Sequence, residues 1–250
     1  MQRRTRTDPG ELARCRMGPP RRRLNNTGWE PLCAARRIPT RSGREGVRIT
    51  TLVSAPDPIV LFQEWFQAAH KVGLPEPSAA ALATVGSEGQ PSARMVLARG
   101  VDERGIVFYT NFQSRKGQEL GGGRSGGVKT SLCFYWPPLN RQVRIEGEAV
   151  PVSNAEADAY WATRPRAHQV AAWASPQSQI LPGGRADLER RYAEMDHRLP
   201  RVNVPRPPFW SGFRVTPRKI EFWEGKPNRL HERTLYQREG SDWVAVTLAP

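Results

Sequence analysis

Residues 79–111, AAALATVGSEGQPSARMVLARGVDERGIVFYTN, set the fold class of this chain. They contain three apolar runs, which are separated by SEGQ at 87–90 and by DERG at 102–105. Both separators are typical of tight turns between antiparallel strands. The stretch therefore predicts an antiparallel meander of three strands.

More strands and a few helices are predicted around this meander. Further strand-like runs lie at 130–136, at 141–153 and, as three more strands, within 209–250. Helices are predicted at 58–72, at 154–165 and at 184–199, with a short one that begins after Ser114. At least seven short strands with peripheral helices predict a mainly β (α+β) fold, and their number indicates a closed β-barrel. The absence of strand–helix alternation and of a GxGxxG motif argues against a Rossmann domain.

The first fifth of the chain differs in composition from the rest. Residues 1–50 contain thirteen arginines and four acidic residues, so they hold +9 of the formal net charge of +14. Residues 1–55 are rich in Gly and Pro and show no apolar periodicity, which predicts a disordered basic extension before a domain at 56–250. The alternatives to a disordered extension are an organelle transit peptide and an arm that contacts nucleic acid. Nucleic acid is nevertheless not an expected partner.

Cysteine content and hydropathy predict a cytoplasmic protein. The three cysteines, Cys15, Cys33 and Cys133, form no CxxC pair and no metal-ligand spacing, which favours a reducing compartment and no metal site. No run of about 18 apolar residues is present, so we expect no membrane-spanning helix.

A row of cationic side chains stands near the C-terminus. Arg229, His231 and Arg233 occupy every second position after Trp223. On a β-strand they would project from one face, and such a face suits an anionic ligand because buried cations need a counter-charge. A solvated edge strand is the alternative. Spacing alone leaves both open.

Other polar stretches have the side chains of a phosphate pocket. Arg94 and Arg99 stand at the two ends of an apolar strand, and Arg115 and Lys116 stand in the first turn of a short helix, where cations are unfavourable unless an anion is bound. Tyr160 and Arg164 are neighbours on a predicted helix. Two polar loops are predicted to contain the remaining candidates: Arg166, His168, Gln177 and Ser178.

Several blocks of this chain resemble the pyridoxamine 5′-phosphate oxidase family. They include RMVLARGVDERGIVFYTNFQSRKGQEL at 94–120, YWATRPRAHQVAAWASPQSQI at 160–180 and IEFWEGKPNRLHER at 220–233. The resemblance implies a homodimeric FMN-binding split β-barrel with two active sites at the dimer interface. It also implies oxidation of pyridoxamine 5′-phosphate or pyridoxine 5′-phosphate by O₂ to pyridoxal 5′-phosphate and H₂O₂, with hydride transfer from substrate C4′ to flavin N5, in vitamin B6 metabolism.

The resemblance also implies residue roles, motif by motif. FMN would be bound by Arg94, Met95, Val96, Leu97, Tyr109, Thr110, Arg115, Lys116, Gln142, Gln177, Ser178, Trp223 and Arg233. The substrate phosphate would be bound by Arg99, Tyr160, Arg164 and His168, and the substrate ring and its reacting carbon by the catalytic residues Arg229 and His231.

Two of these positions depart from the family pattern. The family commonly has Lys where this chain has Arg99, and Ser where it has His168. Arg keeps the charge but changes the geometry of the contact, and His donates best to a phosphate when it is protonated. A flavin split-barrel oxidoreductase with a different substrate therefore stays an alternative, as does an inactive protein that binds pyridoxal phosphate.

Overall fold

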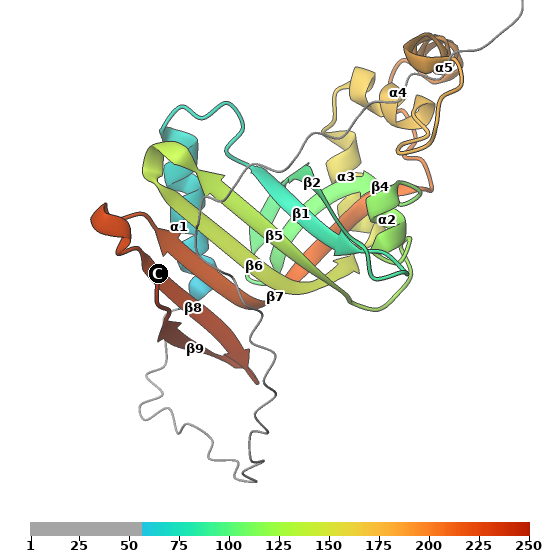
Figure 1. The fold of residues 1–250 in the computed structure, drawn as a ribbon. Helices are drawn as coiled ribbons and strands as arrows, with labels where there is room; N and C mark the ends of the chain where they lie inside the picture. The colour runs from blue at the N-terminus through green and yellow to red at the C-terminus, as the bar shows by residue number, and fades with distance from the viewer. Residues whose placement is uncertain (1–56) are drawn as a thin grey trace, which may run out of the picture. The chain divides into compact units, whose positions relative to one another are not determined.

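The computed structural model describes residues 57–250, which contain nine strands and five α-helices. The strands form one antiparallel sheet (Figure 1): β1 (Ala79–Val85), β2 (Pro91–Leu97), β3 (Gly100–Asp102), β4 (Gly105–Asn111), β5 (Val128–Trp136), β6 (Arg141–Pro151), β7 (Trp210–Glu224), β8 (Glu232–Glu239) and β9 (Asp242–Thr247). The helices are α1 (Pro58–Lys71), α2 (Arg115–Glu119), α3 (Asn154–Ala162), α4 (Arg166–Ala174) and α5 (Gly184–Arg198). The predicted extension at 1–55 lies outside the described residues and stays a prediction.

The chain from β1 to β4 forms two hairpins, so the predicted three-strand meander is wrong. β1 pairs with β2 and β3 pairs with β4, but the hairpins occupy opposite ends of the strand order β2-β1-β5-β6-β7-β4-β3. Only residues 98 and 99 separate them. The N–H of Ala98 donates to Ser78 O beside β1, and the N–H of Arg99 donates to Val107 O in β4, both at 2.8 Å. The sheet therefore curls until its two ends meet at this point.

The sheet does not close into the predicted barrel, because among the described residues β2 pairs only with β1 and β3 only with β4, so no backbone pairing joins its two ends. Strand β7 instead has two neighbours along one edge. Its residues 210–215 pair with β4 and its residues 219–224 pair with β8, while β6 runs along the other edge. The β8–β9 hairpin extends away from the curled part (Figure 1). The fold is the half-barrel of a split barrel, as the resemblance implies.

Helix α1 covers one face of the sheet (Figure 1) and buries Ile59, Phe62 and Ala69 in the main core. Asp57 caps it as predicted, because its Oδ1 accepts a hydrogen bond from the N–H of Ile59 at 2.9 Å. Phe62 is fully buried and contacts Phe134 edge-on, with ring centroids 5.1 Å apart. Burial of one such ring contributes about 1.5–3 kcal/mol relative to exposure.

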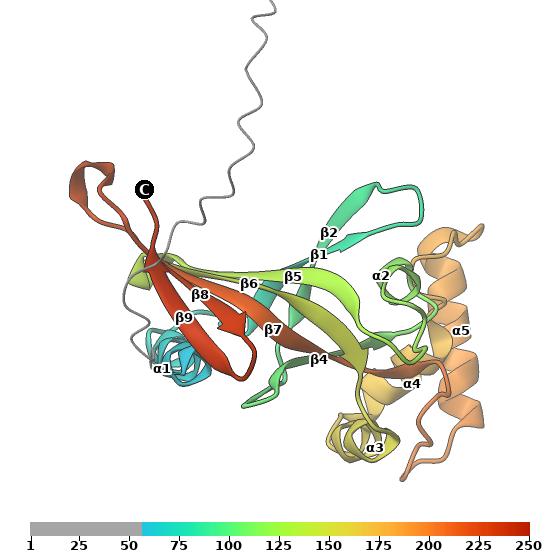
Figure 2. The ribbon, with the colours of Figure 1, turned by 90° about the horizontal axis from the view of Figure 1, so that it is seen from below.

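Helices α2 to α5 lie at the other end of the sheet from α1 (Figures 1 and 2). Ser153 and Glu156 form a capping box at the start of α3. Arg166 and His168 were expected in a loop but lie in the first turn of α4, which Pro165 precedes as the N-cap residue. Proline is compatible with a helix start because its fixed φ suits that position. Within residues 57–250, no helix is long and apolar enough to cross a membrane.

Candidate functional site

A pocket of about 520 Å³ lies between strands β2 and β4 and helices α2, α3 and α4. The curl of the sheet brings these elements together, although they are far apart in the sequence. Thr163 and Pro165 line the pocket without having been predicted. The other ten lining residues are all predicted site residues: Met95, Val96, Leu97, Arg99, Tyr109, Thr110, Lys116, Tyr160, Arg164 and His168.

Lys116 is a half-buried cation that is held by neutral oxygens. Its Nζ lies 3.3 Å from Thr110 Oγ1, 3.3 Å from Gln177 Oε1 and 3.4 Å from Ser114 Oγ. No carboxylate in the described part of the chain pairs with it, and burial lowers its pKa, with the charge of Arg94 adding to the effect. A partly desolvated ammonium without a counter-ion favours the binding of an anion such as phosphate.

Helix α2 places Lys116 and Arg115 in its first turn, as predicted. Ser114 is the N-cap residue, and its Oγ accepts a hydrogen bond from the N–H of Gly117 at 3.2 Å. Position 117 requires glycine, because a Cβ there would lie 2.5 Å from the carbonyl oxygen of Asn111. The tight turn that places Lys116 in the pocket therefore leaves no room for a side chain at position 117.

Arg94 and Arg115 are both held by Glu119. Arg94 Nη2 lies 2.9 Å from Glu119 Oε2, and Arg115 Nε lies 2.9 Å from Glu119 Oε1. Burial by itself would raise the pKa of Glu119, but hydrogen bonds from Thr84, Ser92 and the two arginines lower it to about 2. Glu119 therefore stays ionised and orients Arg94, which does not line the pocket itself.

Tyr160 and Arg164 lie against a group of parallel aromatic rings. The rings of Tyr109 and Tyr160 stack with centroids 3.9 Å apart and planes 11° apart, and the ring of Trp210 is parallel to both. Helix α3 ends at Ala162, so Arg164 is not on the same helix as Tyr160, contrary to the prediction. The loop nevertheless keeps both in the pocket. Burial lowers the pKa of Arg164 and raises that of Tyr109.

Arg99 and His168 lie at the exposed part of the pocket. Arg99 Nη2 is 3.9 Å from Glu76 Oε2, and the arginine side chain is 37% exposed. His168 is exposed on α4, and its main-chain oxygen accepts a hydrogen bond from Arg164 Nη2 at 3.2 Å. Both side chains are accessible from solvent, and Arg99 forms only a long ion pair with Glu76.

The remaining predicted residues form a second group on β6, β7 and β8. Gln142 lies opposite Trp223, and Trp223 lies opposite Arg233, so the three side chains share one face of the sheet. Arg233 Nε is 2.9 Å from Glu221 Oε1, which raises the pKa of Arg233. The buried carboxylate of Glu221 also pairs with Arg144 at 3.1 Å.

Arg229 and His231 lie in a turn rather than on a strand. β8 begins at Glu232, and Pro227–Arg229 form a short 3₁₀ helix, η2. Asn228 and Arg229 there have φ of 58° and 62°, in the left-handed region. The prediction that Arg229, His231 and Arg233 project from one strand face is therefore wrong, because only Arg233 lies on β8.

His231 is nevertheless fixed beside Trp223. Their ring centroids are 4.8 Å apart. The N–H of Lys226 donates to His231 Nδ1 at 3.2 Å. Because a backbone N–H can only donate, the neutral imidazole has its proton on Nε2, which is then a donor.

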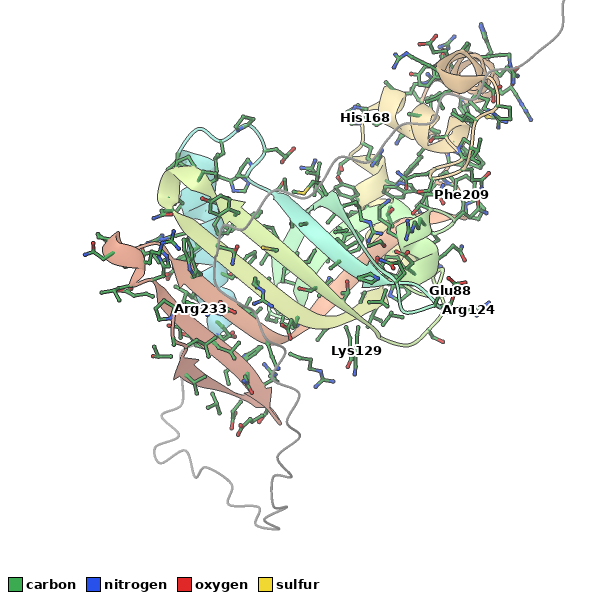
Figure 3. All side chains as sticks on the ribbon, viewed as in Figure 1. Glu88, Arg124, Lys129, His168, Phe209 and Arg233 are labelled. Atoms are coloured by element: carbon green, nitrogen blue, oxygen red, sulfur yellow. The ribbon has the colours of Figure 1, made fainter. Side chains whose placement is uncertain are left out.

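The two groups are far apart within one chain. Trp210 and Trp223 stand near opposite ends of β7, thirteen residues apart, which is a length of roughly 40 Å along the strand at about 3.3 Å per residue. Figure 3 likewise shows His168 and Arg233 at opposite ends of the sheet. A single small ligand cannot contact both groups of one chain.

Comparison with known proteins assigns the chain to a family. Residues 66–198 match the pyridoxamine 5′-phosphate oxidase family, and residues 210–250 match the pyridoxine 5′-phosphate oxidase C-terminal dimerisation region. The chain is 53% identical over 195 residues to the pyridoxine/pyridoxamine 5′-phosphate oxidase of Rubrobacter xylanophilus, covering 78% of this chain and 88% of that protein. This chain belongs to the pyridoxamine 5′-phosphate oxidase family. The oxidase of the same name from Acaryochloris marina is 46% identical over 210 residues, covering 84% of this chain and 93% of that protein.

Solved structures of similar proteins agree with the fold. PhzG from Burkholderia lata 383, in complex with tetrahydrophenazine-1-carboxylic acid, has a TM-score of 0.71 and 37% identity, covering 77% of this chain and 92% of that one. A pyridoxamine 5′-phosphate oxidase-related, FMN binding protein from Nostoc punctiforme PCC 73102 has a TM-score of 0.62 at 18% identity, covering 79% of this chain and all of that one. The second likeness concerns the fold alone.

Three residues that organise this member of the pyridoxamine 5′-phosphate oxidase family were missed in the sequence. Glu119 had a local signal, because it lies four residues after Arg115 on α2 and that spacing predicts an ion pair. No local spacing signal pointed to Glu221 or Trp210, because the residues that they contact lie on other strands and helices.

Proposed function

We propose that this chain oxidises pyridoxamine 5′-phosphate or pyridoxine 5′-phosphate to pyridoxal 5′-phosphate, with FMN as cofactor and O₂ as electron acceptor. The observation that supports it is the pair of half-buried cations in one pocket, Lys116 and Arg164, neither of which has a carboxylate partner among the described residues. Two uncompensated cations suit two phosphate groups, and the proposed reaction brings together two phosphate esters, FMN and the substrate.

The residues around Lys116 fit the phosphate of FMN. Lys116 supplies an ammonium and Thr110 a hydroxyl, and the side chain of Gln177 lies within 3.4 Å of both. Arg115 lies in the same turn. The apolar and aromatic lining, Met95, Val96, Leu97 and Tyr109, is of the kind that covers a flat ring system. Ser178, which has a φ of 72°, follows Gln177.

The residues around Arg164 fit the phosphate of the substrate. Arg164 and Tyr160 supply a guanidinium and a phenol from adjacent positions, and Arg99 and His168 can approach from the exposed side. All four can donate hydrogen bonds to a phosphate when His168 has a proton on the facing nitrogen. Arg99 and His168 are also the two positions at which this chain departs from the family pattern.

The second group would complete the site from another copy of the chain. Gln142, Trp223, Arg229, His231 and Arg233 are too far from the pocket of their own chain, and four of them lie within the matched dimerisation region. Met95 in the pocket and Leu230, which lies between Arg229 and His231, are apolar residues that are 61% and 69% exposed. A homodimer would cover such surface.

In this arrangement the protein binds and orients, and the cofactor supplies the electron chemistry. FMN, when bound, supplies the redox step, which is hydride transfer from substrate C4′ to flavin N5 followed by reoxidation with O₂ to give H₂O₂. His231, whose Nδ1 accepts from the N–H of Lys226, would donate a hydrogen bond through Nε2, and Arg229 would supply a positive charge from the same turn. Both would hold the C4′ substituent of the substrate in position.

A visible spectrum of the purified protein tests this function. We expect flavin absorption bands that bleach when pyridoxamine 5′-phosphate is added without oxygen, and that return when air is admitted. Pyridoxamine without its phosphate is the control and should bleach the bands far more slowly. Flavin bands that neither phosphorylated substrate bleaches would contradict the activity while leaving the cofactor in place.

A different substrate is the second candidate. The 37% identity to PhzG, together with Arg99 and His168 in place of the usual Lys and Ser, favours it. Oxygen uptake with pyridoxamine 5′-phosphate separates the two, because a protein with a different substrate would consume none.

A further inference from the structure

Arg164 is a cation without a charged partner in the described part of the chain. Its Nη2 donates to the main-chain oxygen of His168 at 3.2 Å, while its Nε is buried and has no hydrogen-bond partner. Burial of an uncompensated guanidinium is unfavourable. Other contacts must therefore hold this side chain at the pocket.

The contacts that hold it are aromatic. The guanidinium carbon of Arg164 lies 4.8 Å from the ring centroid of Trp210 and 5.7 Å from that of Trp161. The face of an aromatic ring attracts a cation. Unlike a carboxylate, the ring does not neutralise the charge, so the guanidinium stays available to an incoming phosphate.

Trp210 is itself rigidly held. The residue is 4% exposed, its backbone N–H donates to Pro207 O at 3.0 Å, and its backbone carbonyl oxygen accepts from Arg206 Nη1 at 2.7 Å. It also packs edge-on against Trp161, with ring centroids 4.8 Å apart. Such a fixed ring can set the position of a flexible arginine.

The same ring is aligned with Tyr160. Trp210 is parallel to Tyr160 within 5° and to Tyr109 within 8°. Gly212, two residues further along β7, leaves room for Tyr109, because a Cβ there would lie 2.9 Å from the tyrosine ring. The start of β7 therefore contacts Tyr160 and Arg164, two of the four residues that are assigned to the substrate phosphate.

We propose that Trp210 is a positioning residue for phosphate recognition: it holds the Arg164 guanidinium at the pocket through its ring face and leaves the charge free for the phosphate of the ligand. This inference rests on the proposed function for the identity of that ligand. It predicts a phosphate-specific loss of affinity when the ring is removed.

The test measures equilibrium binding to the FMN-loaded protein, with 4-deoxypyridoxine 5′-phosphate as ligand and 4-deoxypyridoxine as its phosphate-free control. Neither can be oxidised at C4′, so the measurement does not depend on turnover. In Trp210→Leu we expect about 3- to 30-fold weaker binding of the phosphorylated ligand, the range for loss of one desolvated cation–aromatic contact, and unchanged binding of the control. Trp210→Phe should lose less.

A matched variant and a double-mutant cycle distinguish positioning from general damage. Trp243→Leu removes another buried tryptophan that has an arginine, Arg238, 5.1 Å from its ring, and it should leave both affinities unchanged. In Arg164→Gln, the Trp210→Leu change should have no further effect. If Trp210→Leu does not fold, Trp210→Phe takes its place in the cycle.

Equal losses for both ligands, or the same loss with and without Arg164, would overturn the inference. A wild-type protein that binds the phosphorylated ligand but does not oxidise pyridoxamine 5′-phosphate would instead contradict the proposed function. The two failures are therefore distinguishable.

Discussion

Glu119 forms an ion pair with Arg94 behind the candidate pocket, with 2.9 Å between Oε2 and Nη2, and the carboxylate side chain is only 9% exposed. Its pKa of about 2 lies below the ordinary value of 4.5. Such a depressed pKa stabilises the fold above the unfolded-state pKa, and the stabilisation is lost as the pH falls from about 5 toward 2.

Glu119→Gln should therefore destabilise the protein in a pH-dependent way. We expect the free energy of unfolding at pH 7 to fall by about 1–3 kcal/mol, the usual cost of leaving a buried charged hydrogen-bond network incomplete. Urea unfolding should show a smaller difference from wild type at pH 3. Glu189→Gln, which alters an exposed ion pair with Arg185 on α5, is the control and should cost little at either pH. A difference that does not change with pH would contradict the assignment.

Lys116→Ala should weaken FMN binding. Loss of one charge-assisted hydrogen bond to a phosphate predicts about 10- to 100-fold lower affinity for FMN, measured by titrating the apoprotein with the flavin. Lys129→Ala is the matched control, because Lys129 is exposed on β5 and does not line this pocket. Equal FMN affinity in Lys116→Ala and wild type would argue against the phosphate site.

Arg229→Ala should impair turnover without loss of FMN. Arg229 lies in η2, apart from the residues assigned to the flavin phosphate, so the flavin content per chain should stay that of wild type. We expect kcat/KM for pyridoxamine 5′-phosphate to fall by about 10- to 100-fold, as for a lost charged contact. Unchanged turnover at full FMN content would remove Arg229 from the proposed catalytic pair.

Mixed dimers test whether the two groups meet across an interface. Arg164→Ala alters the pocket group and His231→Ala alters the second group. Unfolding and refolding an equal mixture of the two inactive variants should restore about a quarter of wild-type activity, because half of the dimers are mixed and each mixed dimer has one intact site.

The matched control combines two variants of the same group, Arg164→Ala and Tyr160→Phe. Every site of their mixed dimers contains one altered residue, so no activity should return beyond that of the separate variants. An absence of recovery in the first mixture as well, with mixed dimers demonstrated, would mean that both groups act within one chain.

Signals that act over a few residues were read correctly from the sequence. Asp57 before Pro58 predicted the start of α1, Ser114 predicted the cap of α2, and the polar run at 184–199 predicted α5, which ends at Arg198. The strand after the C-terminal turn was predicted to include Arg229 and His231, which is wrong because Asn228 and Arg229 adopt left-handed φ values and β8 begins only at Glu232. Alternation of residue types does not reveal such a conformation.

Strand partners and the grouping of site residues needed the folded chain. The run at 91–102 looks like one strand, yet it divides at residues 98 and 99 and supplies opposite ends of the sheet. Apolar alternation indicates which face of a strand is buried but not which strand lies beside it.

Residue patterns and family blocks thus suffice for the mainly β class, for the capped helices and for membership of the pyridoxamine 5′-phosphate oxidase family. They do not show that Arg164 lies against Trp210, or that the predicted site residues separate into two groups along β7. Capping and propensity act within a few residues of the chain. The curl of the sheet and the burial of a cation against an aromatic ring depend on contacts between residues that are far apart in the sequence.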